Sequence, residues 1–328
     1  MKISKLLFIC LVIFSFACSK QTPLETEQEA AQNGDPQAQL KLAKRYTNGD
    51  GFKQDYTKAL EWLLKAAEQG NREAQYELIA LYERGKQGVS KDPAKALEWA
   101  LKAAEQGHTD AQFYLSYTLE DEQKKLQWCE KAAAQGHANA QYSLGNSYFH
   151  GTGVSKDYNK AVECFTKSAE QDISGAQTML AMCYKNGYGV STDPVKAAEW
   201  WEILAKKGSS DAQYNLALYY SDGKSVPKDP EKALVLLKKA AENFQMAQHD
   251  LGLRYLSGDG VPKDPKKAVE LFSKASNHLS IDARFQLGLC YYRGTGVDKD
   301  VEKAKALIIE CSRFGNASAK DFRQKEGF

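Results

Sequence analysis

The fold of this chain is decided by residues 140–169, which read AQYSLGNSYFHGTGVSKDYNKAVECFTKSA. Variants of this stretch recur about every 36 residues along the 328-residue chain, and each copy opens on an alanine. The opening alanines are Ala38, Ala74, Ala111, Ala140, Ala176, Ala212, Ala247 and Ala283, and Ala319 opens a truncated ninth copy. A fixed period in this range indicates an array of supersecondary units and argues against a globular enzyme domain.

Each copy predicts two helices joined by a turn. In the first segment Ala140, Leu144 and Tyr148 are spaced four residues apart, which places them on one stripe of a helix. A Gly-x-Gly-Val turn follows at 151–154, and Asp157, a preferred N-cap residue, opens the second helix. Because the apolar faces of one such hairpin cannot be covered alone, neighbouring hairpins are expected to stack.

Small residues recur directly after the central leucine of the first helix. Gly145, Gly252 and Gly288 hold this position, although glycine inside a helix costs about 1 kcal/mol relative to alanine. We therefore expect the backbone of a second helix to pack closely there. The third copy, which opens at Ala111, is about seven residues shorter than the others and lacks the Gly-x-Gly-Val turn. This predicts a tighter turn over 119–124.

The charge of the chain gives no indication of a nucleic-acid partner. There are 44 basic and 42 acidic residues, and the formal net charge is +2. The chain therefore lacks the basic field that nucleic-acid binding requires. The charged residues are expected on the solvated outer faces of the helices.

Residues 1–17 differ from the rest and are predicted to be a secretory signal peptide. Two lysines precede an apolar run over 6–14, which is too short to span a bilayer. Cys18 follows in a context that resembles a bacterial lipobox, although Ser15 stands where leucine is usual. We expect cleavage before Cys18 and lipidation of its thiol. The alternative is ordinary cleavage after Ala17, which would release a free secreted protein.

The chain is therefore expected to fall into four parts. Residues 1–17 are the signal peptide, and 18–30 hold the lipidated cysteine and a polar, flexible tether. Residues 31–318 form the array of eight units, with the third unit shortened, and 319–328 form a partial terminal repeat or cap.

The recurring motif Ala-Gln-x-x-Leu-Gly-x-x-Tyr-x-x-Gly-x-Gly-Val-x-x-Asp-x-x-Lys-Ala resembles the Sel1-like repeat (SLR) family, relatives of tetratricopeptide repeats. The residues that carry the resemblance best are Ala140-Gln141, Leu144-Gly145, Tyr148, Gly151, Gly153-Val154, Asp157, Lys160-Ala161 and Ala169. The resemblance extends over about residues 31–319. It implies an all-α fold, a right-handed α/α superhelical solenoid of about eight helix-turn-helix units. It also implies an adaptor that holds protein complexes together.

By analogy with tetratricopeptide repeats, the first helices are expected to line a concave groove. An aromatic residue stands two positions after the opening alanine in five copies: Tyr76, Phe113, Tyr142, Tyr214 and Phe285. One helical turn further on stand Tyr117 and Asn146. Aromatic and amide side chains of this kind can anchor a peptide. The alternative is that the aromatic rings fill the gaps between repeats.

Five cysteines follow Cys18, an odd number for an oxidising compartment. They are Cys129, Cys164, Cys183, Cys290 and Cys311. Cys290 could pair with Cys311, or Cys164 with Cys183, and the alternative is that they are buried small apolar residues. Some cysteine-rich SLR proteins carry regularly spaced cysteine pairs and are described as weak β-lactamases. The irregular spacing here does not match that subgroup.

No motif predicts catalysis, a cofactor or a metal site. Ser221 and Ser225 each match Ser-x-x-Lys, but the Ser-Asp-Asn and Lys-Thr-Gly motifs of penicillin-recognising enzymes are missing. The five histidines are scattered without zinc spacing, and His108 and His137 both follow a helix-ending glycine. We therefore expect a protein without enzyme activity, cofactor or bound metal.

The sequence thus predicts a scaffold that captures an unknown protein or peptide in the groove of its first helices. Its expected location is the cell envelope, as an outer-membrane lipoprotein that faces the periplasm or the cell surface. The expected membrane contact is the lipid anchor at Cys18, and no nucleic acid is expected as a partner. The alternatives are a β-lactamase-like hydrolase and a peptidoglycan- or glycan-binding protein.

Overall fold

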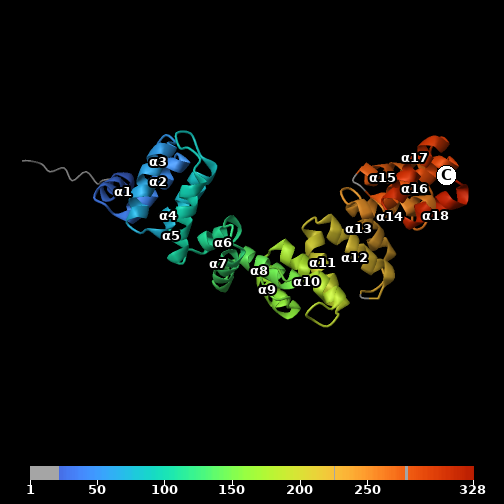
Figure 1. The fold of residues 1–328 in the computed structure, drawn as a ribbon, viewed down its shortest axis with the longest axis horizontal. Coiled ribbons are helices and arrows are strands. Elements are labelled where there is room, and N and C mark those ends of the chain that lie inside the picture. The colour runs from blue at the N-terminus through green and yellow to red at the C-terminus, as the bar shows by residue number, and fades with distance from the viewer. Residues whose placement is uncertain (1–21, 225, 278–279) are drawn as a thin grey trace, which may run out of the picture. The chain divides into compact units, whose positions relative to one another are not determined.

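The computed structural model describes residues 22–224, 226–277 and 280–328, and within them the chain is all-α (Figure 1). In seven of the eight sequence copies the two predicted helices pack against each other as a hairpin. The predicted fold class, a solenoid of stacked α/α hairpins, is confirmed. The chain divides into two compact units, residues 1–131 and 132–328, and each has hydrophobic clusters of its own.

The helices of the first unit are α1 (Pro23–Gln32), α2 (Pro36–Asn48), α3 (Tyr56–Glu68), α4 (Arg72–Arg84), α5 (Pro93–Glu105) and α6 (Thr109–Thr118). The boundary between the units falls within α7 (Glu122–Ala134). The helices of the second unit are α8 (Ala138–His150), α9 (Tyr158–Glu170), α10 (Ser174–Asn186), α11 (Pro194–Lys206), α12 (Ser210–Asp222), α13 (Pro230–Ala240), α14 (Gln245–Ser257), α15 (Pro265–Asn277), α16 (Ile281–Arg293), α17 (Val301–Arg313) and α18 (Ala317–Glu326).

The α8–α9 hairpin illustrates why each copy of the sequence folds in this way. α8 ends at Gly151, and α9 begins after Asp157. The Asp157 carboxylate accepts hydrogen bonds from the N–H groups of Asn159 and Lys160 (3.0 and 3.1 Å), while its own N–H donates to the carbonyl of Tyr148 (2.9 Å). This one residue therefore satisfies backbone groups at both helix ends. The same bond to a tyrosine carbonyl recurs at Asp55, Asp92, Asp193, Asp229, Asp264 and Asp300.

The small residue after the central leucine makes room for a large side chain from the second helix of the same hairpin. A Cβ atom added to Gly145 would lie 2.6 Å from the ring of Phe165, and one added to Gly252 would lie 2.6 Å from the ring of Phe272. The expectation that a helix backbone packs against these glycines is therefore wrong, because an aromatic ring fills the space.

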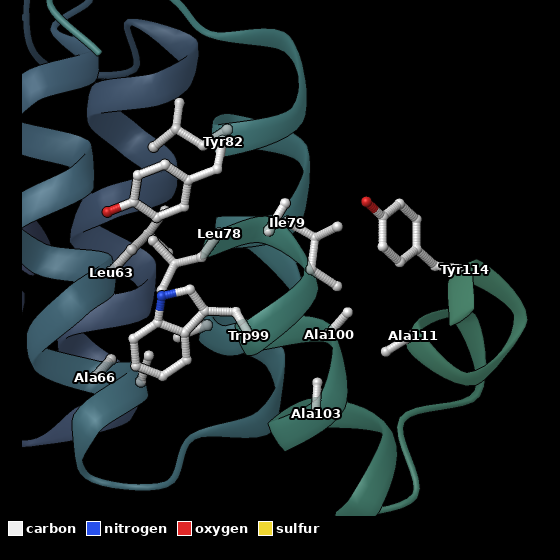
Figure 2. Packing of buried hydrophobic residues seen from close by; sticks show 14 of the residues in the cluster. Leu63, Ala66, Leu78, Ile79, Tyr82, Trp99, Ala100, Ala103, Ala111 and Tyr114 are labelled. Atoms are coloured by element: carbon white, nitrogen blue, oxygen red, sulfur yellow. The ribbon is translucent and has the colours of Figure 1, made fainter. Parts of the chain in front are cut away.

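The sizes of these two residues vary together from hairpin to hairpin. Where the first position holds Ala43, the second holds Leu63. In the next hairpin the first position holds the large residue, Ile79, and the second holds the small one, Ala100. Both lie in the buried cluster of the first unit (Figure 2). A small residue at one position thus accompanies a large one at the other, as a core packed to crystal-like density requires.

A buried glutamine ties most of the hairpins to their neighbours. Gln75, next to the opening alanine of α4, donates from Nε2 to the carbonyl of Ala67 near the end of α3 (3.0 Å). Its Oε1 accepts from Nε2 of Gln106, which follows α5 (2.7 Å). One side chain therefore holds three consecutive helices, and it adds a second kind of donor to a carbonyl that also accepts from the N–H of Gly70 (3.0 Å). The bond to the carbonyl eight residues earlier recurs at Gln39, Gln112, Gln141, Gln177 and Gln213, and Arg284 makes it in the eighth copy.

The predicted tether is wrong for residues 23–30, which form most of α1. Thr22 caps this helix, because its Oγ1 accepts from the N–H of Glu25 (3.2 Å) and the Glu25 carboxylate accepts from the N–H of Thr22 (2.8 Å). Gln39 donates to the carbonyl of Ala31 (3.1 Å), as the other glutamines do to the second helix of the preceding hairpin. α1 therefore takes the place of a second helix before the first copy.

The structure describes the shortened third copy and the terminal repeat but not the predicted signal peptide. The signal peptide, 1–17, and Cys18 lie outside the described residues and stay predictions. In the shortened third copy α6 has 10 residues where α8 has 13, and only 119–121 separate it from α7. The partial terminal repeat expected at 319–328 is largely α18, which packs on α17.

The second glycine of a Gly-x-Gly turn lies against the preceding hairpin. A Cβ atom added to Gly189 (φ 68°) would lie 2.2 Å from the carbonyl oxygen of Tyr158, the first residue of α9. One added to Gly187 (φ 77°), which ends α10, would meet nothing closer than the methyl group of Thr192 (3.1 Å). Both positions require a left-handed backbone, but Gly189 is also required for the contact between hairpins.

We expect Gly189→Ala to destabilise the protein more than Gly187→Ala. The left-handed backbone costs alanine about 1–2 kcal/mol at either position. At Gly189 the methyl group must also displace a backbone carbonyl, and overpacking of this kind adds about 1–3 kcal/mol. Urea denaturation followed by far-UV circular dichroism measures both losses, and equal losses at the two glycines would contradict the predicted contact.

The pairing of Gly145 with Phe165 predicts a change of sign in a double-mutant cycle. Gly145→Ala alone should lower the free energy of unfolding by about 1–3 kcal/mol, because the ring of Phe165 blocks the new methyl group. In a Phe165→Leu background, which copies the Ala43–Leu63 pair, the same substitution should be stabilising by up to about 1 kcal/mol, the helix preference of alanine over glycine. An effect of the same sign and size in both backgrounds would show that the two positions are independent.

Candidate functional site

Tyr214 and Phe285 are buried, although the sequence predicts that both face a groove. Their side chains are 8% and 7% exposed. The Tyr214 hydroxyl donates to Oδ2 of Asp250 (2.7 Å), and burial together with this carboxylate raises the pKa of Tyr214. The ring of Phe285 packs against Phe322 with the centroids 6.3 Å apart. The surface role predicted for these two residues is therefore wrong.

Tyr76 and Tyr142 are half-buried and fill gaps between successive copies. The ring of Tyr76 stacks on the imidazole of His108, the N-cap residue of the first helix of the next copy, with the centroids 4.3 Å apart. The ring of Tyr142 lies over Gly175, where an added Cβ would come within 2.8 Å of it. For these two residues the alternative interpretation, packing between repeats, describes the contacts that the structure contains.

Tyr117 is the most accessible of the predicted groove residues. Its side chain is 61% exposed, and the edge of its ring meets Phe113 and Tyr114 with centroid distances of 5.5 Å. The Tyr114 hydroxyl in turn is hydrogen-bonded to the Glu83 carboxylate. Phe113 is half-buried, and so is Asn146 in the second unit. Only Tyr117 of this set therefore presents a largely open side chain.

The second unit also exposes apolar side chains that the sequence-based prediction of a groove missed. The sixth residue after the opening alanine is Met182 in α10, Leu218 in α12, Leu253 in α14 and Leu289 in α16. Met182, Leu218 and Leu253 are 37%, 41% and 36% exposed, and Leu289 is half-buried. We call these four residues the apolar row. They hold one position on equivalent helices of four successive hairpins.

The position of the apolar row is not fixed by the packing of the hairpin. In the earlier copies it carries Lys44, Ala80, Tyr117 and Asn146. Lys44 Nζ contacts the carboxylates of Glu77 (2.9 Å) and Glu73 (3.7 Å). Burial opposes the charge on Lys44, but the two carboxylates outweigh it and raise the pKa of the ammonium group. Comparing residue types at this single position along the copies would have revealed the row from the sequence.

Side-chain hydrogen bonds join the first helices of neighbouring hairpins beside the apolar row. Lys185 Nζ of α10 donates to Oδ1 of Asn215 in α12 (3.5 Å). Arg254 of α14 donates to the hydroxyl of Ser221 in α12 (3.4 Å), and the bond between Tyr214 and its aspartate joins the same two helices. Because these helices are linked side by side, their row residues belong to one surface.

The hydrogen bond that the structure shows at the Ser221 hydroxyl does not come from a base that could activate a serine nucleophile. Its hydroxyl accepts a hydrogen bond from the guanidinium of Arg254, which stays protonated and cannot accept a proton. Ser225, the second Ser-x-x-Lys residue, lies outside the described residues.

Cys164, Cys183, Cys290 and Cys311 are free thiols in the structure. The two pairings that the sequence left open, Cys164 with Cys183 and Cys290 with Cys311, are therefore not formed. Burial raises the pKa of Cys183 and of Cys290 to about 11. Because the thiolate is the reactive form, these side chains behave as small apolar core residues.

The histidines that follow helix-ending glycines cap helices. Nδ1 of His108 accepts from the N–H of Ala111 (3.4 Å), and Nδ1 of His137 accepts from the N–H of Ala140 (3.1 Å). Within residues 22–224, 226–277 and 280–328, no group of three His, Cys, Asp or Glu side chains is arranged to hold a metal ion. No helix in the same residues has the length and apolar character needed to cross a bilayer.

Three open crevices lie beside the inter-helix loops. Their volumes are about 500, 1000 and 700 Å³, and they are lined mainly by 46–58, 291–302 and 220–231. The apolar row, by contrast, lies on the first helices of the second unit. The row and the crevices are therefore separate surface features.

Comparison with known families identifies the repeats. The model of the family described as Sel1 repeat matches eight successive segments, which together take up most of the chain. They are residues 36–71, 72–108, 109–137, 138–173, 174–209, 210–243, 245–278 and 281–308. Each segment up to residue 243 begins close to a first helix and includes the second helix of the same hairpin.

Two solved structures resemble the chain in both sequence and fold. One is a protective antigen of uropathogenic Escherichia coli strains that displays an SLR fold, with 33% sequence identity and a TM-score of 0.81. The similarity covers 91% of this chain and 66% of the other, so the chain spans just under two thirds of that protein. The second is a Sel1 repeat protein from Oxalobacter formigenes, with 30% identity, a TM-score of 0.68 and 94% of each chain covered. No curated protein matches the chain.

Proposed function

Because the chain belongs to the Sel1 repeat family, we propose that it is a protein-interaction scaffold that binds a partner protein through the apolar row. The observation that carries this proposal is the exposure of Met182, Leu218 and Leu253 at one position of three successive hairpins. Burial of apolar surface contributes about 25 cal/mol per Å². The complex with a partner that covers the row is therefore stabilised by burial of apolar surface that is exposed in the free chain.

The proposal includes no catalytic step, and the two alternatives have weaker support. A hydrolase that uses Ser221 would need a proton acceptor where Arg254 donates a hydrogen bond. A glycan-binding protein that uses the aromatic residues of the first helices would lose Tyr214 and Phe285, which are buried. Neither difficulty affects binding by the apolar row.

The proposed location is the bacterial cell envelope. Residues 1–17 have the character of a signal peptide, and Cys18 follows at the predicted cleavage point. The similar Escherichia coli protein is described as a protective antigen, which fits an exported chain. Lipidation of Cys18 would hold the scaffold at a membrane, and more than one acyl chain makes such attachment stable.

The row predicts that one set of substitutions abolishes partner capture without unfolding the protein. Met182→Ser, Leu218→Ser and Leu253→Ser together should weaken binding at least about tenfold, because buried anchor residues each contribute more than about 1 kcal/mol. Substitutions of exposed residues usually change stability by less than about 0.5 kcal/mol each, so the thermal midpoint should change little. The measurement is affinity capture from envelope extracts with quantitative mass spectrometry.

A matched control for this experiment lies on the second helices. Val195→Ser, Ile203→Ser and Val235→Ser remove side chains that are 52%, 39% and 54% exposed but do not belong to the row. This control should capture the same proteins as the unmodified chain. If the row variant captures the same proteins as well, the row is not the binding surface.

The lipid anchor predicts a change of cell fraction. Cys18→Ala should move the protein from the detergent-extracted membrane fraction to the soluble fraction, because each buried CH₂ of an acyl chain contributes about 0.8 kcal/mol. Cys164→Ala is the control and should leave the protein with the membrane. An unchanged distribution of the Cys18→Ala variant would contradict lipidation at this residue.

A further inference from the structure

We propose that the segment bound by the apolar row is an amphipathic α-helix of the partner, with an apolar residue at every seventh position and basic residues along one flank. This inference rests on the proposed function and adds the chemistry of the occupant. Four observations support it: the spacing of the row, its size, its acidic edge and its restriction to successive hairpins of the second unit.

The spacing of the row follows from the helices that carry it. Met182, Leu218, Leu253 and Leu289 stand on α10, α12, α14 and α16, one residue to a hairpin. Side-chain hydrogen bonds link α10 to α12 and α12 to α14. Helices that pack as neighbours have axes about 8–10 Å apart, so successive row residues are offset by about that distance.

A helix matches this offset better than an extended strand. Seven residues of an α-helix make nearly two turns and rise about 10.5 Å, so residues seven apart lie on one face at a spacing close to the upper end of this range. In a strand, residues on one face are about 6.6 or 13 Å apart, because side chains alternate and each residue rises about 3.3 Å. A helix that crosses α10 to α16 can therefore meet each row residue with one of its own.

The size of the row favours a single helix over a second copy of the chain. A stable protein–protein interface buries about 800 Å² on each partner. Four side chains, three of them exposed by 36–41%, offer far less than this when two rows meet. A single amphipathic helix, by contrast, needs only a narrow apolar strip, and recognition then depends on regularly spaced anchors.

The edge of the row predicts the charge of the partner helix. The residue before the opening alanine is Asp211 in α12, Met246 in α14 and Asp282 in α16. Met246 is 54% exposed and extends the apolar surface, while the aspartates lie in the first turns of their helices. On a helix these residues share a face with the row residues seven positions later. Lysine or arginine on the partner flank that meets this edge would complement both carboxylates.

The test uses two synthetic peptides of about four heptads with the same composition. In the first, leucines recur at every seventh position and lysines lie along one flank. In the second, the same leucines alternate with polar residues, as in a strand. Fluorescence anisotropy measures affinity, and circular dichroism measures helix formation on binding. We expect the first peptide to bind at least tenfold more tightly and to become helical.

Variants of the protein assign the binding to the row. Met182→Ser, Leu218→Ser and Leu253→Ser together should remove binding of the first peptide, while the control with Val195→Ser, Ile203→Ser and Val235→Ser should retain it. Asp211→Asn with Asp282→Asn should weaken binding several-fold and reduce its salt dependence. These two substitutions keep the size of the side chain and remove only the charge.

The outcomes distinguish this inference from the proposed function. Equal affinity for the two peptides, or binding that the row substitutions leave unchanged, would overturn the helical occupant. If neither peptide binds while protein capture still depends on the row, the helix is wrong and the scaffold proposal stands. If capture also proceeds without the row, both are wrong.

Discussion

The buried glutamine that follows the opening alanine in six copies is the interaction on which the array depends. A hairpin with two apolar faces needs neighbours, but apolar contact alone does not fix their register. The amide of Gln75 does so because its donor and its acceptor meet different helices, α3 through Ala67 and the end of α5 through Gln106. An apolar residue of similar size would still fill the space, but it would leave the α3 carbonyl without this partner. The carbonyl would keep its bond from the N–H of Gly70 (3.0 Å), so the loss would be the hydrogen bonds of the amide itself, each worth about 0.5–1.5 kcal/mol.

This arrangement decides which positions of a first helix remain for a partner. The opening alanine, the glutamine, the central leucine and the small residue after it all face other helices, and the aromatic residue two positions after the alanine covers the gap between copies. Tyr214 and Leu218 show the consequence. They lie one turn apart on α12, yet the first is 8% exposed and the second 41%. A partner can therefore contact the position of Leu218 and the residue just before the opening alanine, which is Asp211 in α12.

The sequence predicted the hairpins well because their signals are local. Asp157 caps a helix through bonds to residues two and three positions away, and a left-handed glycine ends the helix before it. α1 was missed because it belongs to no copy of the repeat, although Thr22 and Glu25 form a capping box that is visible in the sequence. Contacts between distant residues were harder to predict. Gly145 indicated a close approach, but only the structure identified Phe165 as the neighbour.

The groove was predicted from the wrong residues for a related physical reason. Aromatic side chains are common both in binding surfaces and in cores, so residue type could not separate Tyr214, which is buried, from Tyr117, which is open. The difference lies in the position on the first helix, since Tyr214 stands two residues after its opening alanine and Tyr117 stands six residues after its own. At the position of the row the packing of the hairpin does not require an apolar residue, since Lys44 and Ala80 occupy it in the first unit, although Leu289 at the end of the row packs against the cluster around Phe285. Met182, Leu218 and Leu253 at three successive such positions add exposed surface that favours aggregation and does not help the hairpins fold. When another apolar surface covers these side chains, their burial stabilises the complex.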